Sequence, residues 1–425
     1  MRRLHILRPY TISFFVMQQT GPMTTPPSQN TQRNRLLLAL SLLLILVLIG
    51  SGLGAYFTFF SHRPATTNTP SSVAGYAYFV SSGLLSVNPN SNQGITDEIQ
   101  ITLKGIPNPP TGKSYYAWLL NDKTLQWNPI PLGQLNVNNG TAVLSYNGDA
   151  HHTDLLATNS RLLVTQEDAG TTPVNPSQDA NALVYYAEFS QIPNPADPKH
   201  FSLYAHLKHL LANDPDVKQV GLTGGLDIWL YRNTQKILEW AGSARDAQGT
   251  GGTAFMRRQL MRILDYLDGT YYIQQDLPGS SLQVDPTIAK IGLLTFDPSN
   301  QNPPGYVYHI GKHLREIASL PESTPEQKAL AAQINQSLDI VDGWLHMIRI
   351  DALQLYKMSD TQLLSSDARS QLDALATLAN EAFVGQLNSQ GQVVDGIVQI
   401  HYNIQRLATF TIQGCITNHP CPSLM

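Results

Sequence analysis

The hydrophobic period of this chain changes once, near residue 190, and that change most constrains what the chain can fold into. Before it, short runs rich in β-branched and aromatic residues show a period of two and are bounded by Pro, Gly, Asn and Asp. Runs of this kind with no helix between them predict an all-β antiparallel sandwich, Ig-like, over residues 73–190. The six runs are 73–80, 98–105, 114–120, 141–146, 161–167 and 182–189.

Beyond residue 198 the period becomes 3.6, which predicts an α-helical bundle over 199–413, followed by a tail over 414–425. Its start signals include "STPEQ", where Ser323 or Thr324 caps a helix and Pro325 occupies the first turn. The longest apolar stripe consists of Leu330, Ile334, Leu338, Val341, Leu345 and Ile348. Further helices are expected near 200–212, 225–245, 256–267, 309–320, 366–387 and 393–407.

An uncharged run begins at Leu36 and ends at Phe60. At about 1.5 Å per residue, a helix over 36–60 exceeds the roughly 30 Å hydrocarbon core of a bilayer. We therefore predict a single transmembrane helix. A cleaved signal peptide is the alternative, but its apolar stretch is roughly 7–15 residues long and ends at small residues, whereas this run is longer and ends in aromatic residues.

The residues around this run predict its orientation. Five arginines and no acidic residue precede it, so the positive-inside rule places the disordered tail 1–35 in the cytoplasm. The remainder, after a Pro, Thr and Ser-rich linker over 61–72, is then the extracytoplasmic part of a plasma-membrane protein. Gly50 and Gly54 have the G-x-x-x-G spacing through which two such helices form a homodimer.

The distribution of charge limits the kinds of molecule that the chain can bind, and the two cysteines indicate the compartment. Of the 27 Lys and Arg residues, five precede the apolar run, whereas all 31 Asp and Glu residues follow it. This acidic excess disfavours nucleic acid as a partner. The two cysteines, Cys415 and Cys421, predict one short-loop disulfide in an oxidising compartment; in a reducing one, a metal site is the alternative.

The stretch "GIPNPPTGKSYYAWLL" begins at Gly105 and ends at Leu120. Its G-I-P and P-x-G-K-x-Y-x-x-W-L patterns, with the later turn Pro131, Leu132 and Gly133, resemble the extracytoplasmic C-terminal domain of anti-sigma-K factors of the RskA type. The resemblance covers about residues 73–190.

The same stretch also has a purely structural interpretation. Alternation along the strand sends Tyr116, Trp118 and Leu120 to one face and Tyr115, Ala117 and Leu119 to the other. We expect the first set to face the core, rather than to form a ligand platform.

The resemblance implies a membrane-anchored sensor or binding module that regulates a sigma-factor or envelope-response pathway, with an envelope or regulatory protein as partner and no catalysis. In that family the extracytoplasmic domain is associated with signal reception and regulated proteolysis. The chain departs from the family at its start, because residues 1–35 lack the apolar pattern of the helical domain that holds the sigma factor. Only the sensory half is implied.

The histidines of the predicted bundle carry a second, independent hypothesis. In "YHIGKHLRE", His309, His313 and Glu316 fall at i, i+4 and i+7 on one helical face. Two imidazoles and a carboxylate can bind a divalent metal, and histidines also hold haem. The candidate metal ligands are His309, His313, Glu316 and His346, with His401 as a further histidine.

The structural alternative is that these residues lie at the edge of an apolar stripe, where their polar atoms are satisfied and bind no ligand. His206, His209 and His401 also border such stripes, and Asp339, Asp342 and His346 share another face.

No G-x-S-x-G, P-loop, H-E-x-x-H or G-x-G-x-x-G motif is present, so we predict that the chain is not an enzyme. The sensor is the first function hypothesis and a metal- or haem-binding bundle is the second.

Overall fold

The computed structural model describes residues 73–425 except 87, 89, 124, 416–420 and 422–425. The predicted tail 1–35, membrane helix 36–60 with Gly50 and Gly54, and linker 61–72 lie outside the described residues.

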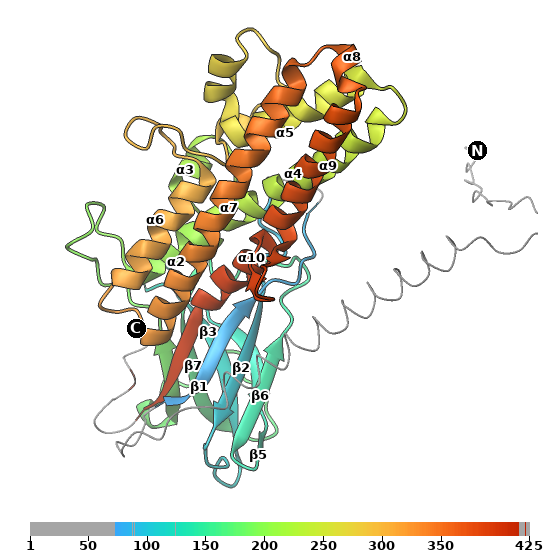
Figure 1. Cartoon of the computed structure of the whole chain (residues 1–425). Helices are drawn as coiled ribbons and strands as arrows, with labels where there is room; N and C mark the ends of the chain where they lie inside the picture. The colour runs from blue at the N-terminus through green and yellow to red at the C-terminus, as the bar shows by residue number, and fades with distance from the viewer. Residues whose placement is uncertain (1–72, 87, 89, 124, 416–420, 422–425) are drawn as a thin grey trace, which may run out of the picture. The chain divides into compact units, whose positions relative to one another are not determined.

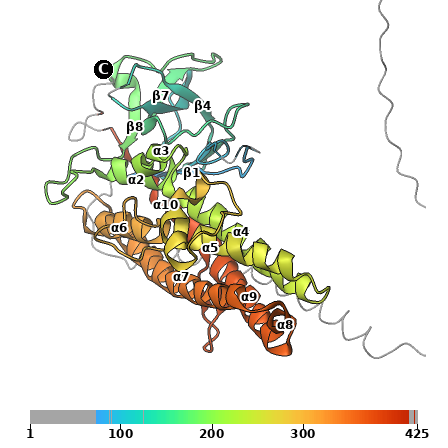
Figure 2. The same ribbon diagram turned by 90° about the horizontal axis from the view of Figure 1, so that it is seen from above.

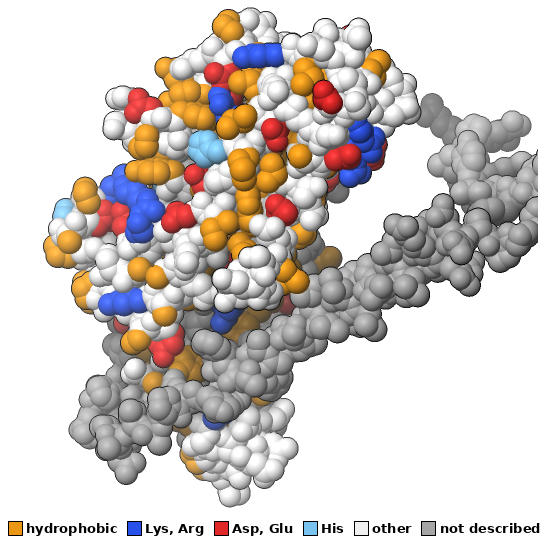
Figure 3. All heavy atoms as spheres, in the orientation of Figure 1, with side chains coloured by type: hydrophobic (Ala, Val, Ile, Leu, Met, Phe, Trp, Pro, Cys, Tyr) orange, Lys and Arg blue, Asp and Glu red, His pale blue; other side chains and the backbone are white. Residues whose placement is uncertain are grey.

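None of the described helices combines the length and the apolarity needed to cross a membrane. The longest, α7 (Pro325–Lys357), carries charged side chains along its length. Figure 3 shows Lys, Arg, Asp and Glu scattered among hydrophobic side chains over the helical region. The prediction of a fold with a single transmembrane helix, and of a single-pass plasma-membrane protein, is therefore corrected, because no described helix meets its requirement.

Nine of the described strands form one antiparallel sheet rather than two sheets packed face to face. Its order is β4-β3-β7-β8-β11-β1-β2-β6-β5. The strands are β1 (Val73–Val80), β2 (Glu98–Lys104), β3 (Lys113–Asn121), β4 (Ile130–Leu135), β5 (Val137–Asn138), β6 (Thr141–Tyr146), β7 (Asn159–Asp168), β8 (Leu183–Glu188) and β11 (Thr409–Gly414).

The predicted sandwich is wrong because of β11, a strand of the sheet that follows all the helices in the sequence. Gln413 pairs with Tyr186 of β8, and Thr411 pairs with Tyr76 of β1, so β11 joins two groups of strands into one sheet. In Figure 1 this strand, red, lies beside blue β1. The period-two pattern of 73–190 cannot reveal a strand contributed by residues that were predicted to belong to the bundle.

The sheet is nearly closed by its own curvature. Edge strand β4 approaches β6, and a Cβ added to Gly133 would lie 3.4 Å from Leu144. The interior of this curled sheet belongs to the large hydrophobic core.

Strand β3 alternates as predicted and is buried on both faces, so each set of residues lies in a hydrophobic core. Tyr115, Ala117 and Leu119 belong to the large core shared with the helices. Trp118 lies on the opposite face in a small cluster of its own, where its indole N–H donates to Thr165 over 2.8 Å. The small cluster consists of Tyr116, Trp118, Leu120, Leu163 and Leu183.

Nine described helices follow β8. Seven lie where the apolar stripes indicate, whereas the two short helices over 215–219 and 360–363 were not predicted. The nine are α2 (Leu203–Leu211), α3 (Pro215–Gln219), α4 (Leu226–Gln248), α5 (Thr253–Asp276), α6 (Tyr306–Ser319), α7 (Pro325–Lys357), α8 (Asp360–Leu363), α9 (Ser366–Val384) and α10 (Ile397–Leu407). Short strands β9 (Gln386–Leu387) and β10 (Val393–Val394) pair between α9 and α10, and 3-10 turns occur at Ala180–Ala182 and Ile288–Lys290.

The start of α7 and the glycine inside α5 show how local sequence shapes the helices. Thr324 caps α7 through a capping box with Gln327, and Pro325 sits in the first turn, as predicted. The helix expected near 256–267 continues further, and Gly269 takes φ 71° at a kink inside α5. A Cβ there would meet the backbone N of Gly292 at 2.8 Å, so only glycine fits this close approach.

One hydrophobic core runs from the sheet into the helices. At the junction, Phe410 of β11 stacks on Phe189 with ring centroids 4.1 Å apart, and Phe189 stacks on Tyr204 of α2. The Tyr204 hydroxyl donates to the carbonyl of Leu156 over 3.1 Å. Helix α2 is thereby fixed between the sheet and α6, as Figure 2 shows from above.

The chain end is attached to the outer face of the sheet. Cys415 and Cys421 form the disulfide that their spacing predicted. The backbone N–H of Cys415 donates to the carbonyl of Val184, and Cys421 packs against the small cluster around Trp118.

Candidate metal centre

Helices α2 and α6 bring four histidines together. Ser202 caps α2 by accepting from the N–H of Ala205, and His206 and His209 follow on the buried face, three residues apart. His309 and His313 lie one turn apart on the buried face of α6. The two pairs face each other where the helices pack.

The closest group in this cluster has three members. Nδ1 of His206 lies 2.8 Å from Nδ1 of His313. Oε2 of Glu316 lies 3.5 Å from the first nitrogen and 3.7 Å from the second. Both histidines are buried, and the carboxylate is 20 % exposed. The three atoms form a small triangle, the arrangement of ligands around one ion.

His313 is the centre of the cluster. Its ring centroid lies 5.1 Å from that of His206, 5.2 Å from that of His209 and 5.0 Å from that of His309. Phe201 covers the group, with its ring 4.5 Å from that of His209. His313 therefore contacts the other three imidazoles, and all four histidines are buried.

Two aspartates at the start of α3 border the other side of the cluster. Asp214 is the N-cap and accepts from the backbone N–H groups of Asp216 and Val217. Nε2 of His309 lies 3.8 Å from Oδ2 of Asp216. Two further sets of three therefore have ligand atoms within 4.8 Å of one another: His209 with Asp214 and His313, and His309 with Asp214 and Asp216.

Burial keeps these imidazoles neutral. It lowers the pKa of His206 to about 4, of His209 to about 3 and of His309 to about 4. Burial, followed by the neighbouring histidines, holds the pKa of His313 well below its usual value. A neutral imidazole keeps a lone pair for a metal ion or a proton.

Several nitrogens of the cluster have no hydrogen-bond partner among the described residues. They are Nε2 of His206, Nδ1 of His209 and Nε2 of His313. Buried polar atoms are paired in the great majority of cases, so three orphans in one cluster need a cause. Nδ1 of His206 and Nδ1 of His313 are hydrogen-bonded to each other, so the unpaired atom of each of these two rings is Nε2. Three unpaired nitrogens count against the structural alternative, in which each histidine is satisfied.

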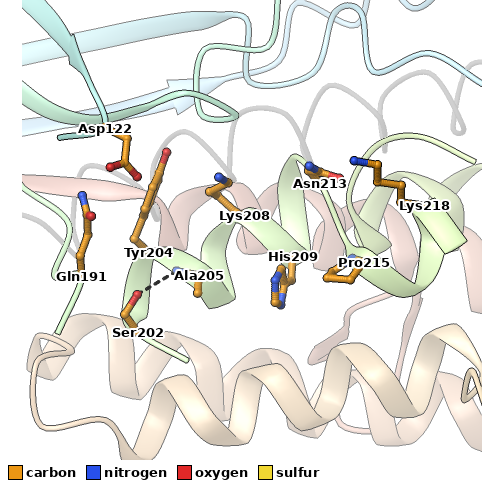
Figure 4. A pocket seen from close by; sticks show the side chains of 10 residues that line it. All are labelled: Asp122, Gln191, Ser202, Tyr204, Ala205, Lys208, His209, Asn213, Pro215 and Lys218. Atoms are coloured by element: carbon orange, nitrogen blue, oxygen red, sulfur yellow. Dashed lines mark hydrogen bonds between the residues drawn. The ribbon is translucent and has the colours of Figure 1, made fainter. Parts of the chain in front are cut away.

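A cavity of about 490 Å³ borders the cluster. Figure 4 shows that it lies along α2, with Asp122 at one end and Lys218 at the other. Lys208 and Lys218 point to one side of α2 and His209 to the opposite side. His209 therefore belongs both to the lining of the cavity and to the histidine cluster.

The residues predicted as metal ligands do not form one ligand group. His313 and Glu316 join His206, whereas His309 joins Asp214 and Asp216. His346 is 43 % exposed on α7, 3.6 Å from Asp342, and belongs to no ligand group among the described residues. His401 is satisfied elsewhere, between Oδ2 of Asp227 at 2.6 Å and Gln405 at 2.8 Å.

Sequence reasoning missed Asp214 and Asp216 and noted His206 and His209 only as edge residues. The signal was present in "HLKHLLANDPD", where two histidines and two aspartates lie within one short segment. Ordinary helix capping explains Asp214 equally well, which hides its proximity to the histidines.

No protein-family model, curated protein or solved structure matches this chain. The resemblance to anti-sigma-K factors therefore stays a prediction from sequence.

Proposed function

We propose that this chain is a metal-binding protein that holds a divalent transition-metal ion between α2 and α6. The ligands are Nδ1 of His206, Nδ1 of His313 and a carboxylate oxygen of Glu316. The proposal concerns binding and assigns no reaction.

The spacing of the three ligand atoms carries the proposal. Ligands about 2.0–2.2 Å from a tetrahedral zinc ion lie about 3.3–3.6 Å apart. The three separations of 2.8, 3.5 and 3.7 Å bracket that range. A central ion therefore needs only a small opening of the two imidazoles.

The chemistry of the ligand set favours zinc or a neighbouring divalent ion. Zn²⁺ binds both imidazole nitrogen and carboxylate oxygen, and imidazole also suits copper, iron and nickel. A haem iron is disfavoured, because two axial nitrogens on opposite sides of one metal are about 4 Å apart, whereas these nitrogens lie 2.8 Å apart.

A zinc titration of the full chain tests the proposal. After purification with a chelator, we expect isothermal titration with Zn²⁺ to show tight binding. Glu316→Gln and His313→Asn each remove a ligand, so zinc binding should weaken by at least about 100-fold, the upper end of the effect of losing a supporting residue. The matched control is His346→Asn, which changes the same residue type on the exposed face of α7 and should bind zinc as the parent does.

Circular dichroism of each variant separates lost binding from lost folding. Folded Glu316→Gln and His313→Asn proteins that bind zinc like the parent would contradict the proposal, as would a parent chain that binds none. The sensor function implied by the resemblance has no structural observation in its favour and stays a prediction.

A further inference from the structure

We infer that the histidine cluster holds a second divalent ion, bound by Asp214, Asp216 and His309 on the side of α3. This inference rests on the proposed function, because it extends the same cluster from one ion to two.

The second set of ligands is independent of the first. His206, His313 and Glu316 bind the first ion, and none of them belongs to the group of Asp214, Asp216 and His309. In this second group all three ligand atoms lie within 4.8 Å of one another, and the imidazole of His309 is 3.8 Å from Asp216. Both sites can therefore be filled at once without sharing a side chain.

The two sites are adjacent. His309 and His313 are stacked with their ring centroids 5.0 Å apart, and each ring serves a different ion. The pair of ions would therefore be neighbours within one cluster rather than two unrelated sites.

An unpartnered histidine points to a ligand on this side. His209 is 9 % exposed, and its Nδ1 has no hydrogen-bond partner among the described residues. It forms a ligand group with Asp214, which is a ligand of the second ion, and with His313, which is a ligand of the first. An ion at Asp214 gives this nitrogen an electrostatic partner that the described side chains do not provide.

Charge and the neighbouring cavity favour the same position. Two carboxylates balance a divalent cation, which reduces the cost of placing it in a largely buried site. His209 also lines the cavity along α2, so the cavity and this side of the cluster are adjacent. Mixed nitrogen and carboxylate ligands suit Zn²⁺ and also Mn²⁺.

Equilibrium dialysis of the full chain against Zn²⁺, followed by elemental analysis, tests the inference. We expect two zinc ions per chain in the parent and one in Asp216→Asn, whose side chain is partly exposed and tolerates the change. His309→Asn is a second variant with the same expected loss, and Glu316→Gln should lose the other ion. Asp339→Asn, an exposed aspartate on α7, is the matched control and should keep two.

The outcomes distinguish the two proposals. One ion in the parent and one in Asp216→Asn would overturn the second site and leave the first intact. Two ions in the parent and two in both Asp216→Asn and His309→Asn would also overturn it, because the extra ion would lie elsewhere. No ion in the parent would refute the proposed function itself.

Discussion

Replacing Phe410 by alanine is expected to lower the free energy of unfolding by about 3–5 kcal/mol. Phe410 is 1 % exposed in β11, at the point where the sheet meets the helices. Its ring packs against Phe189 and Phe79, with centroids 4.1 and 5.7 Å away. The substitution leaves a cavity between elements that cannot easily collapse together, so the cost should lie at the upper end for a core residue.

Urea unfolding of the parent and the variant measures this effect. Phe255→Ala is the matched control, because Phe255 lies in the first turn of α5 with 38 % of its surface exposed. We expect the control to cost under about 1 kcal/mol, as surface substitutions do. Equal losses in the two variants would show that β11 is not part of the cooperative core.

In the metal-free protein, His206→Gln should change how stability depends on pH. Burial lowers the pKa of His206 from 6.5 to about 4. As the pH falls, the unfolded chain therefore takes up this proton before the folded chain does. The stability contributed by neutral His206 is complete above about pH 6.5 and is lost as the pH falls towards about 4, a change of about 3 kcal/mol.

The difference in unfolding free energy between parent and variant isolates this contribution. It should shrink by about 3 kcal/mol between about pH 6.5 and about pH 4, because glutamine does not titrate. Buried carboxyls with raised pKa values act in the opposite direction but are present in both proteins and cancel. They are Asp154 at about 7, and Asp214, Asp265 and Asp268 at about 6. A difference that is constant across this range would contradict the neutral state of His206.

Alternation predicts which residues of β3 share a face, but not which face meets the larger core. Tyr116, Trp118 and Leu120 were expected to face the core, and they form a small buried cluster. The helices, however, pack on the side of Tyr115 and Leu119. Which side they cover is decided by the chain that follows β8 and by the insertion of β11, and neither leaves a trace in the strand itself.

Only the part of the candidate site that lies on one helix could be predicted from the sequence, because contacts between distant segments leave no local pattern. Helical spacing correctly placed His313 and Glu316 on one face of α6, because that relation is local. The partner of His313 is His206, 107 positions away, and this contact depends on how α2 docks. His346 was predicted as a metal ligand together with His313 and Glu316. It lies on another helix, α7, where its side chain is 43 % exposed.

The position of β11 also determines when this sheet can be completed during synthesis. β8 ends at Glu188 and β11 starts at Thr409, so roughly 220 residues must be translated between them. At about 5–20 residues per second this takes roughly 10 to 45 s, during which the edges of β8 and β1 await their common neighbour. A nascent chain with two open strand edges is a natural client for chaperones, and a message truncated before residue 409 would yield a protein that exposes both edges.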